Sequence, residues 1–236
     1  MKIQVQQSDL VRALGAVSNV VSSKTTLPIL STVLFDAKKS GLTLAATDLD
    51  VSVVTRVREV QLDKDGKAAV PASKFVAFVR TLGPDPVTMS TTTDKVKVQS
   101  GKARLEEPCM NPDDFPSLPK LQDDTSFEIE SGVLTDMIRN TIYAISRDET
   151  RPALQGILWE LGSKSFTMVA TDGHRLSRVR RDVDLGIKEE RKLIASSAGL
   201  QQVLRLAEDV EKVKVYVGEH QLLSLIHISE PTRQDT

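Results

Sequence analysis

The chain has 236 residues, of which 40% are hydrophobic and 4% aromatic, so aliphatic side chains must fill any core. Its 31 basic and 32 acidic residues give a net charge of −1, without the overall basic bias of most nucleic-acid binders, although a balanced chain can still have one basic face. A single cysteine, Cys109, excludes an intrachain disulfide, and the absence of a membrane-length apolar run or signal peptide favours a cytoplasmic protein.

The first half of the chain predicts alternating strands and amphipathic helices. Leu10, Leu14 and Val17 share one apolar stripe of the first helix, and Val76 and Val79 do so in the second. In chain order we expect a strand at 2–5, a helix with Ser8 as its N-cap, strands at 29–36, 42–46 and 51–60, a helix at 73–82, and strands at 87–90, 95–99 and 103–106.

The second half repeats the first at a constant offset of 124 residues. Pro28 matches Pro152, and Thr47-Asp48 matches Thr171-Asp172 without a gap. The repeat predicts a strand at 127–129 and a helix with Ser131 as its N-cap. We therefore expect two similar domains, at 1–120 and 121–222, joined through the polar, proline-rich stretch 111–120.

The last residues depart from the repeat. Residues 223–236 resemble the translated read-through of a sequencing adapter and are expected to be a non-native tail, in which His227 carries no functional weight. A divergent strand native to the protein is the alternative.

The string Thr171–Leu176 is the most distinctive in the chain. Asp172 beside His174 is compatible with an acid–base pair or a metal site, but the ligand spacings of a zinc site and the motifs of hydrolases and phosphate loops are missing. Because the first repeat shares Thr-Asp, a structural turn in which the aspartate accepts backbone N–H bonds is the favoured interpretation. A small-molecule enzyme using Asp172 and His174 remains the alternative.

Basic side chains lie on or beside the predicted helices and off their apolar stripes, where they are either ordinary solvated residues or contacts to nucleic-acid phosphates. Apart from Phe75 and Phe78, these helices lack base-stacking aromatics, which argues against single-strand or RNA recognition. The candidate DNA-binding residues are Lys24, Lys74, Arg80, Arg147 and Arg151.

From Met1 to about residue 222 the chain resembles the bacterial DNA polymerase III beta subunit family. The resemblance is carried by Thr26–Leu30, Ala46–Asp50, Val70–Ala72, Phe115-Pro116, Arg151 with Leu154 and Gly156, and Ala170–Leu176.

This resemblance implies an α+β DNA-clamp fold, with repeated domains in which two helices pack on antiparallel sheets. Subunits of the family have three such domains, and two subunits form a ring that encircles duplex DNA without reading its sequence. The ring tethers the replicative polymerase and confers processivity without being an enzyme, and it needs neither cofactor nor metal. The implied partners are duplex DNA, the polymerase III catalytic subunit, the clamp loader and other proteins with a clamp-binding motif.

The resemblance also implies roles for particular residues. Lys24, Lys74 and Arg80 match positions that face the DNA, and Arg147 and Arg151 lie in a loop that approaches it, whereas Ser73 stands where relatives often have a basic residue. The pocket for partner peptides matches Leu154, Thr171, Gly173, His174, Arg175 and Leu176.

The third domain of the family and the end of the second have no counterpart in this sequence. We therefore expect that the polypeptide does not close a ring by itself. A two-domain DNA-binding module that never forms a ring is a further alternative.

Overall fold

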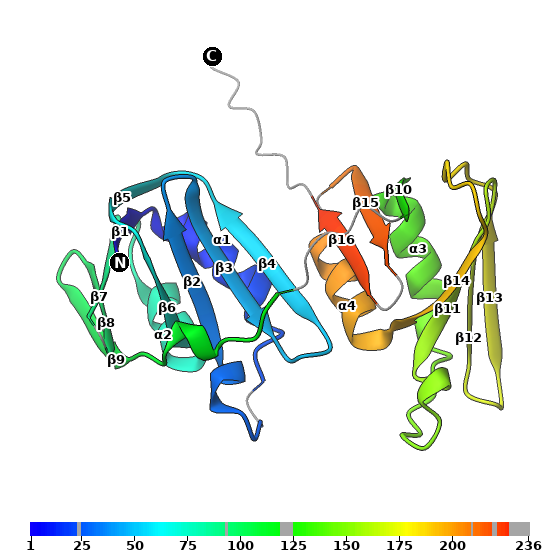
Figure 1. Ribbon diagram of the computed structural model, residues 1–236, viewed down its shortest axis with the longest axis horizontal. Coiled ribbons are helices and arrows are strands. Elements are labelled where there is room, and N and C mark those ends of the chain that lie inside the picture. Colours follow the sequence, from blue (N-terminus) through cyan, green and yellow to red (C-terminus); the bar gives the residue numbers. More distant parts are fainter. Residues whose placement is uncertain (23–24, 93, 119–124, 209, 219–220, 227–236) are drawn as a thin grey trace, which may run out of the picture. The chain divides into compact units, whose positions relative to one another are not determined.

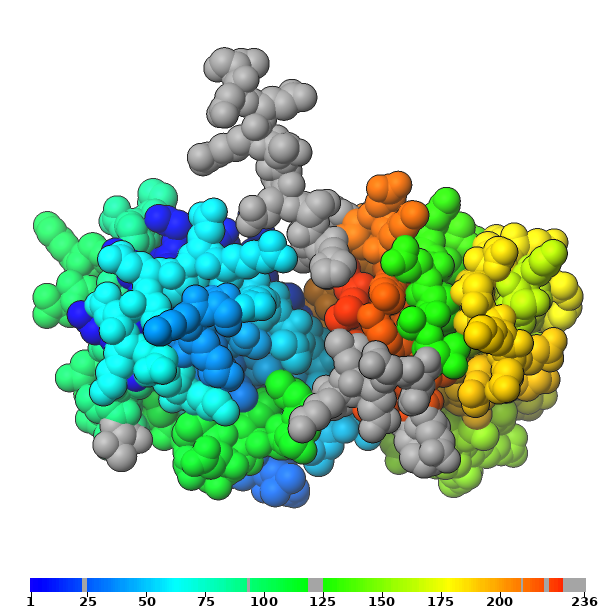
Figure 2. Space-filling model, turned by 45° about the horizontal axis from the view of Figure 1, so that its top comes forward, coloured from blue at the N-terminus to red at the C-terminus, as the bar shows by residue number. Residues whose placement is uncertain are grey.

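The computed structural model describes residues 1–22, 25–92, 94–118, 125–208, 210–218 and 221–226, so Lys24 lies outside the described residues. Contacts within the chain divide it into two compact units, Met1–Pro119 and Lys120–Thr236. Figure 1 shows the first unit in blue to green and the second in green to red, and Figure 2 shows their atoms in the same colours.

The first unit alternates strands with two α-helices. Strand β1 packs between β5 and β7 in a five-stranded sheet of order β5-β1-β7-β8-β9, and a four-stranded sheet has the order β4-β3-β2-β6. Helix α1 packs against β3 and β4, and α2 packs against α1 and β6. The bounds are β1 Lys2–Val5, α1 Gln7–Val17, η1 Pro28–Ser31, β2 Thr32–Lys38, β3 Gly41–Thr47, β4 Ser52–Val57, β5 Val60–Lys64, β6 Gly66–Pro71, α2 Ala72–Thr81, β7 Val87–Thr91, β8 Lys95–Ser100, β9 Ala103–Pro108 and η2 Pro112–Asp114.

The second unit repeats this plan. Its sheets have the orders β13-β12-β11-β14 and β10-β15-β16, with every strand pairing antiparallel. Helix α3 packs against β12, β13 and α4, and α4 packs against β14. The bounds are β10 Thr125–Glu130, α3 Ser131–Ile142, η3 Pro152–Leu154, β11 Gly156–Leu161, β12 Phe166–Thr171, β13 Leu176–Arg181, β14 Arg191–Ser196, α4 Ser197–Leu206, β15 Lys212–Val217 and β16 Leu222–Ile226.

The offset of 124 residues carries over into the structure. Strand β4 begins at Ser52 and β13 at Leu176, and the short helices η1 and η3 begin at Pro28 and Pro152. The predicted arrangement of two helices per unit on antiparallel sheets is confirmed. In both units the inward faces of the helices and sheets are apolar and buried, which is the arrangement that removes the largest hydrophobic area from water.

Two predicted helix caps are wrong. Strand β1 runs almost directly into α1, so the helix begins at Gln7 and Ser8 lies within its first turn. Ser131 is the first residue of α3, after the N-cap Glu130, and its buried hydroxyl donates to the carbonyl of Ala207. Ser8 therefore lies inside a helix, and Ser131 forms a hydrogen bond with the C-terminal end of α4.

Strand bounds also differ where proline or local turns intervene. The strand expected at 29–36 begins at Thr32, because Pro28–Ser31 forms a short 3-10 helix. The strand expected at 51–60 ends at Val57, and the chain then turns into the unpredicted strands β5 and β6. In the segment expected to be a tail, residues 223–226 belong to β16, which pairs with β15, and residues 227–236 lie outside the described residues.

Candidate functional site

The loop between β12 and β13 is a turn held by the side chains of Thr171 and Asp172. Asp172 Oδ1 accepts hydrogen bonds from the backbone N–H groups of His174 and Arg175, both at 3.0 Å. Thr171 Oγ1 donates to the carbonyl of Arg175 at 2.7 Å and accepts from the amide of Gly173 at 3.1 Å. Gly173 has a positive φ of 89°, which a residue without a Cβ adopts at low cost.

Both carboxylate oxygens of Asp172 accept hydrogen bonds within the turn. Its Oδ2 accepts from Arg175 Nε at 3.0 Å, and the two backbone bonds, followed by this contact, lower the pKa of the Asp172 carboxyl. The His174 side chain forms no hydrogen bond with a described residue, and its backbone alone contacts Asp172. The two residues are therefore not arranged as a hydrogen-bonded acid–base pair.

The first unit contains the same turn between β3 and β4. Asp48 Oδ1 accepts from the amides of Asp50 and Val51, and Thr47 Oγ1 accepts from the amide of Leu49. The prediction that Thr-Asp makes a structural turn in both repeats is confirmed. What differs between the copies is the exposed tip of the turn, which is Leu49-Asp50 in the first unit and Gly173-His174 in the second.

The residues predicted to bind a partner peptide gather at one end of the β13-β12-β11-β14 sheet. Strand β11 begins at Gly156, one residue beyond the end of η3, while β12 ends at Thr171 and β13 begins at Leu176. Antiparallel pairing brings these three points to the same end of the sheet. Leu176 is 64% exposed, although water disfavours such a large apolar side chain. Leu154 is half-buried.

Arg151 lies against this turn. Its Nη1 atom is 3.5 Å from the position that a Cβ on Gly173 would take, and its Nε is 3.5 Å from Asp148 Oδ2. The structure thus places Arg151, a predicted DNA-binding residue, beside Gly173, a predicted peptide-binding residue.

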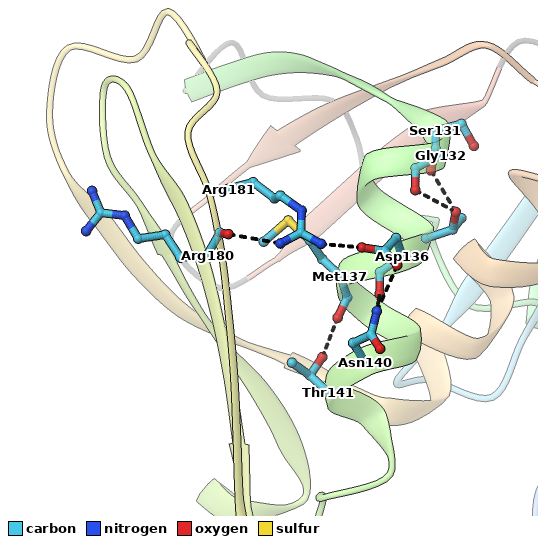
Figure 3. Close-up of polar contacts among 9 residues, drawn as sticks. Ser131, Gly132, Asp136, Met137, Asn140, Thr141, Arg180 and Arg181 are labelled. Carbon is cyan, nitrogen blue, oxygen red and sulfur yellow. Dashed lines mark hydrogen bonds and ion pairs between the residues drawn. The ribbon is translucent and has the colours of Figure 1, made fainter.

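Strand β13 is fastened to helix α3 at two points. Arg181 Nη2 forms a 2.6 Å ion pair with Asp136 Oδ2, and Ser177 Oγ donates to the carbonyl of Asn140 at 2.6 Å. Figure 3 shows Arg181 reaching from the strand to the helix, while the side chain of Arg180 points away from it. These contacts fix the strand that begins with Leu176, and sequence reasoning missed them because the partners are far apart in the chain.

A cleft of about 610 Å³ opens beside the same turn. The guanidinium of Arg175 lies over the ring of Tyr143 at 5.7 Å, and Arg147 lines the cleft from the loop after α3. Two predicted site residues that were assigned to different ligands, Arg147 and Arg175, therefore meet in one cleft. The lining residues are Ile142, Tyr143, Ile145, Ser146, Arg147, Asp172, Arg175, Ser197 and Gln201.

The predicted DNA-binding residues of the first unit are exposed on α2. Lys74 Nζ stands 3.6 Å from Glu107 Oε1, and its side chain is 78% exposed. Arg80 lies in the last turn of the helix, where a cation interacts favourably with the helix dipole. Ser73 is exposed in the first turn.

Within the described ranges, no three histidine, cysteine, aspartate or glutamate side chains converge as metal ligands do. None of the described helices has the length and apolar character needed to cross a membrane.

Two copies of an α+β unit, each with two helices on antiparallel sheets and a Thr-Asp turn at one sheet end, define a repeated clamp-domain architecture. The chain belongs to the DNA polymerase III beta subunit family: the model of its N-terminal domain matches residues 1–119 and that of its central domain matches residues 128–230. The second match includes residues 223–230 of the segment expected to be a tail.

Named relatives agree with this assignment. The "Beta sliding clamp" of Bacillus subtilis is 27% identical over 232 residues, which cover 94% of this chain and 61% of that relative. A crystal structure of the Pseudomonas aeruginosa DNA polymerase III subunit beta superimposes with a TM-score of 0.90 at 28% identity, covering 95% of this chain and 62% of that one. A further structure from that organism, described as bound to griselimycin, has a TM-score of 0.89. The predicted clamp fold is confirmed, and the chain spans about 61% of the length of the Bacillus subtilis relative.

Proposed function

We propose that this chain is the N-terminal and central part of a sliding clamp, which encircles duplex DNA and tethers the replicative polymerase in the cytoplasm. The observation that carries the proposal is the consecutive match of two clamp-domain models, to residues 1–119 and 128–230. In this function the protein is a non-catalytic processivity subunit of a nucleotidyltransferase complex. Its partners are duplex DNA, the polymerase III catalytic subunit, the clamp loader and other proteins with a clamp-binding motif.

The exposed apolar end of β13 is the partner-peptide site in this proposal. Leu154 and Leu176 supply its apolar wall, His174 and Arg175 supply its polar rim and backbone, and Thr171 and Gly173 belong to the same site. The geometry supports this role because Leu176 is exposed while the turn before it is held rigidly by Asp172, so little ordering entropy is lost on binding. The backbone amide of Leu154 donates to the carbonyl of Arg151, which holds this residue at the end of η3.

Peptide binding tests this site. A fluorescent peptide with the apolar clamp-binding motif of a polymerase is titrated into the chain, with griselimycin as a second probe. Leu176→Ala is expected to weaken peptide binding at least tenfold, since an apolar anchor contributes about 2 kcal/mol at such interfaces. Because the side chain is exposed, stability should stay within about 0.5 kcal/mol of the parent. Ile194→Ala, an exposed apolar residue on β14, is the matched control.

The enzyme alternative is tested by the same variants. A hydrolytic or other activity lost in His174→Ala, with peptide binding retained and unaffected by Leu154→Ala or Leu176→Ala, would overturn the clamp proposal.

The chain spans about 61% of the length of the Bacillus subtilis relative. We propose that the expressed polypeptide does not form a closed dimer, and that the full-length protein does. Sedimentation velocity measures this directly, and a stable closed dimer of the 236-residue chain would contradict it. A two-domain module that never forms a ring would bind linear and closed circular DNA equally, whereas a full-length clamp slides off linear ends.

A further inference from the structure

The three arginines of strand β13 divide between the two faces of its sheet. Arg181 Nη2 pairs with Asp136 Oδ2 of helix α3 at 2.6 Å, so this side chain lies on the face that packs against the helices. Side chains alternate between the faces of a strand, which places Leu176, Arg178 and Arg180 together on the opposite face. Figure 3 shows the side chain of Arg180 pointing away from α3. Leu176, Arg178 and Arg180 are the outer strip of β13.

The cations of the outer strip are accessible to a partner. Arg178 is exposed, and no described carboxylate lies within ion-pair distance of it. Arg180 Nε lies 3.5 Å from Asp182 Oδ1, but both side chains are more than half exposed, so water competes with this pair. Glu160, which the register places on the same face, is held by Lys192 Nζ at 2.7 Å. The outer strip therefore presents positive charge, although the chain as a whole has a net charge of −1.

An apolar surface accompanies these cations. Val169 on β12 pairs directly with Arg178, and Leu158 on β11 pairs with Val169. Both apolar residues are half-buried and lie on the outer face, because cross-strand neighbours share a face. The strip itself begins with Leu176, which is 64% exposed. A protein segment with acidic and apolar side chains matches this surface, whereas nucleic-acid phosphates would leave its apolar part uncovered.

The spacing of the strip fits an extended chain. Successive outward residues of a strand are about 7 Å apart, and an extended segment laid along β13 has the same repeat. With an apolar anchor at Leu176, side chains two and four residues away from the anchor come opposite Arg178 and Arg180. Acidic residues at these two positions would meet one arginine each.

The outer strip is particular to the second unit. At the offset of 124 residues, Leu176 and Arg178 correspond to Ser52 and Val54. The first unit thus has neither the apolar anchor nor the cation next to it.

We propose that the outer strip binds an acidic segment of a partner protein, directly beside the apolar motif that occupies the site of Leu176. Carboxylates of the segment pair with Arg178 and Arg180, so the residues next to the motif help to set the affinity of each partner. The inference rests on the proposed function in one respect, that Leu176 anchors a partner peptide.

The test compares three fluorescent peptides that share one apolar clamp-binding motif. The first has glutamate two and four residues before the motif, the second has glutamate two and four residues after it, and the third has glutamine at all of these positions. One of the two glutamate peptides is expected to bind the whole chain about fivefold more tightly than the glutamine peptide, which two exposed ion pairs can supply. This gain should shrink at high salt, because salt screens exposed charges.

Substitutions locate the effect on the strand. Arg178→Gln and Arg180→Gln should each reduce the gain from glutamate and leave the affinity for the glutamine peptide unchanged, a split that a purely structural role would not produce. Arg191→Gln removes an exposed arginine of β14 that pairs with Glu189 at 3.6 Å. It lies outside the strip and should alter the binding of no peptide.

Two outcomes would overturn the proposal. One is equal affinity of all three peptides for the chain. The other is a duplex oligonucleotide whose binding is weakened by Arg178→Gln while the peptides remain equal, which would make the strip a nucleic-acid surface.

The glutamine peptide separates this proposal from the proposed function. If it binds and Leu176→Ala weakens it, but glutamate adds nothing, the outer strip alone fails. Absence of binding by all three peptides would contradict both the outer strip and the partner-peptide site.

Discussion

Leu49 and Gly173 occupy equivalent positions in the Thr-Asp turns of the two units, with φ angles of 82° and 89°. In both turns a threonine hydroxyl accepts the amide of this residue, so the backbone geometry is imposed by the Thr-Asp pair and not by the residue at the tip. Leucine adopts this geometry at a cost of about 1–2 kcal/mol, which glycine avoids.

We expect Leu49→Gly to raise the free energy of unfolding by about 0.5–1 kcal/mol, because relief of the backbone strain exceeds the added chain entropy of glycine. Gly173→Ala is expected to lower it by about 1 kcal/mol or more. Urea unfolding of each variant measures both changes. Gly15→Ala is the control, since Gly15 lies within α1 with nothing within 4 Å of an added Cβ, and should be stabilising. A stabilising Gly173→Ala would contradict the turn geometry.

The turn of the second unit is expected to respond to acid. The pKa of Asp172 is lowered, chiefly by the backbone bonds from His174 and Arg175, so its carboxylate should titrate below the ordinary value of 3.8. A carboxylate whose folded pKa is depressed contributes stability above its unfolded pKa, and that contribution is lost as pH falls through the folded value. Carboxyl carbon NMR gives the midpoint, and the amide shifts of His174 and Arg175 should follow it. A midpoint above the ordinary aspartate value would show that the turn is not held this way.

Periodicity in the sequence predicts some elements well because burial enforces it. Strand β8 alternates between exposed and buried residues along its whole length, and its predicted bounds differ from the observed ones by one residue. Strand β5 was missed because its sequence is mostly polar, as an edge strand with one partner permits. The repeat, rather than periodicity, predicted the Thr-Asp turn.

Contacts between distant residues were beyond sequence reasoning. Asp136 and Arg181 are 45 residues apart, and no local pattern records that their side chains meet at 2.6 Å. The stacking of Arg175 on Tyr143 is equally hidden, since it depends on how the end of α3 packs beside the β12–β13 turn. The exposure of Leu176 was equally beyond a local pattern. It depends on β13 being an edge strand, and only the sheet order shows this.

The core of the second unit contains a polar atom without a partner. Trp159 is fully buried, its Nε1 has no hydrogen-bond partner in the described structure, and its ring packs edge-on to Phe166 at 5.0 Å. The first unit has Phe35 at this position, packed on Phe75, whose own counterpart in the second unit is Gly199. The second unit thus has the larger ring at the position of Phe35 and no side chain at the position of Phe75.

We expect Trp159→Phe to change the unfolding free energy by less than about 1.5 kcal/mol, because removal of the unsatisfied donor offsets the lost packing. The reciprocal change, Phe35→Trp, should cost about 1–3 kcal/mol, since Phe75 leaves no room for a larger ring. Chemical denaturation of the two variants makes the comparison. If Trp159→Phe were the more damaging of the two, the indole N–H would have to be satisfied in solution.

The cations of α2 are the candidate contacts of the first unit with duplex DNA. Each phosphate neutralised by a protein cation contributes about −0.9 to the slope of log K against log salt concentration. Arg80 forms no ion pair with a described carboxylate, so Arg80→Ala should reduce the slope by about that amount. Lys74 Nζ lies 3.6 Å from Glu107 Oε1 and must break this ion pair to contact a phosphate. Lys74→Ala should therefore reduce the slope by less than Arg80→Ala does.

Glu107→Gln separates these contributions, because it frees Lys74 and should strengthen duplex binding while leaving the contribution of Arg80 unchanged. The measurement is fluorescence anisotropy of a labelled duplex over a range of salt concentrations. Lys39→Ala, an exposed lysine in the turn between β2 and β3, is the control and should leave the slope unaltered. Equal changes of the slope in Lys39→Ala and Arg80→Ala would mean that DNA binding depends only on the net charge of the chain. In that case α2 makes no defined contact with DNA.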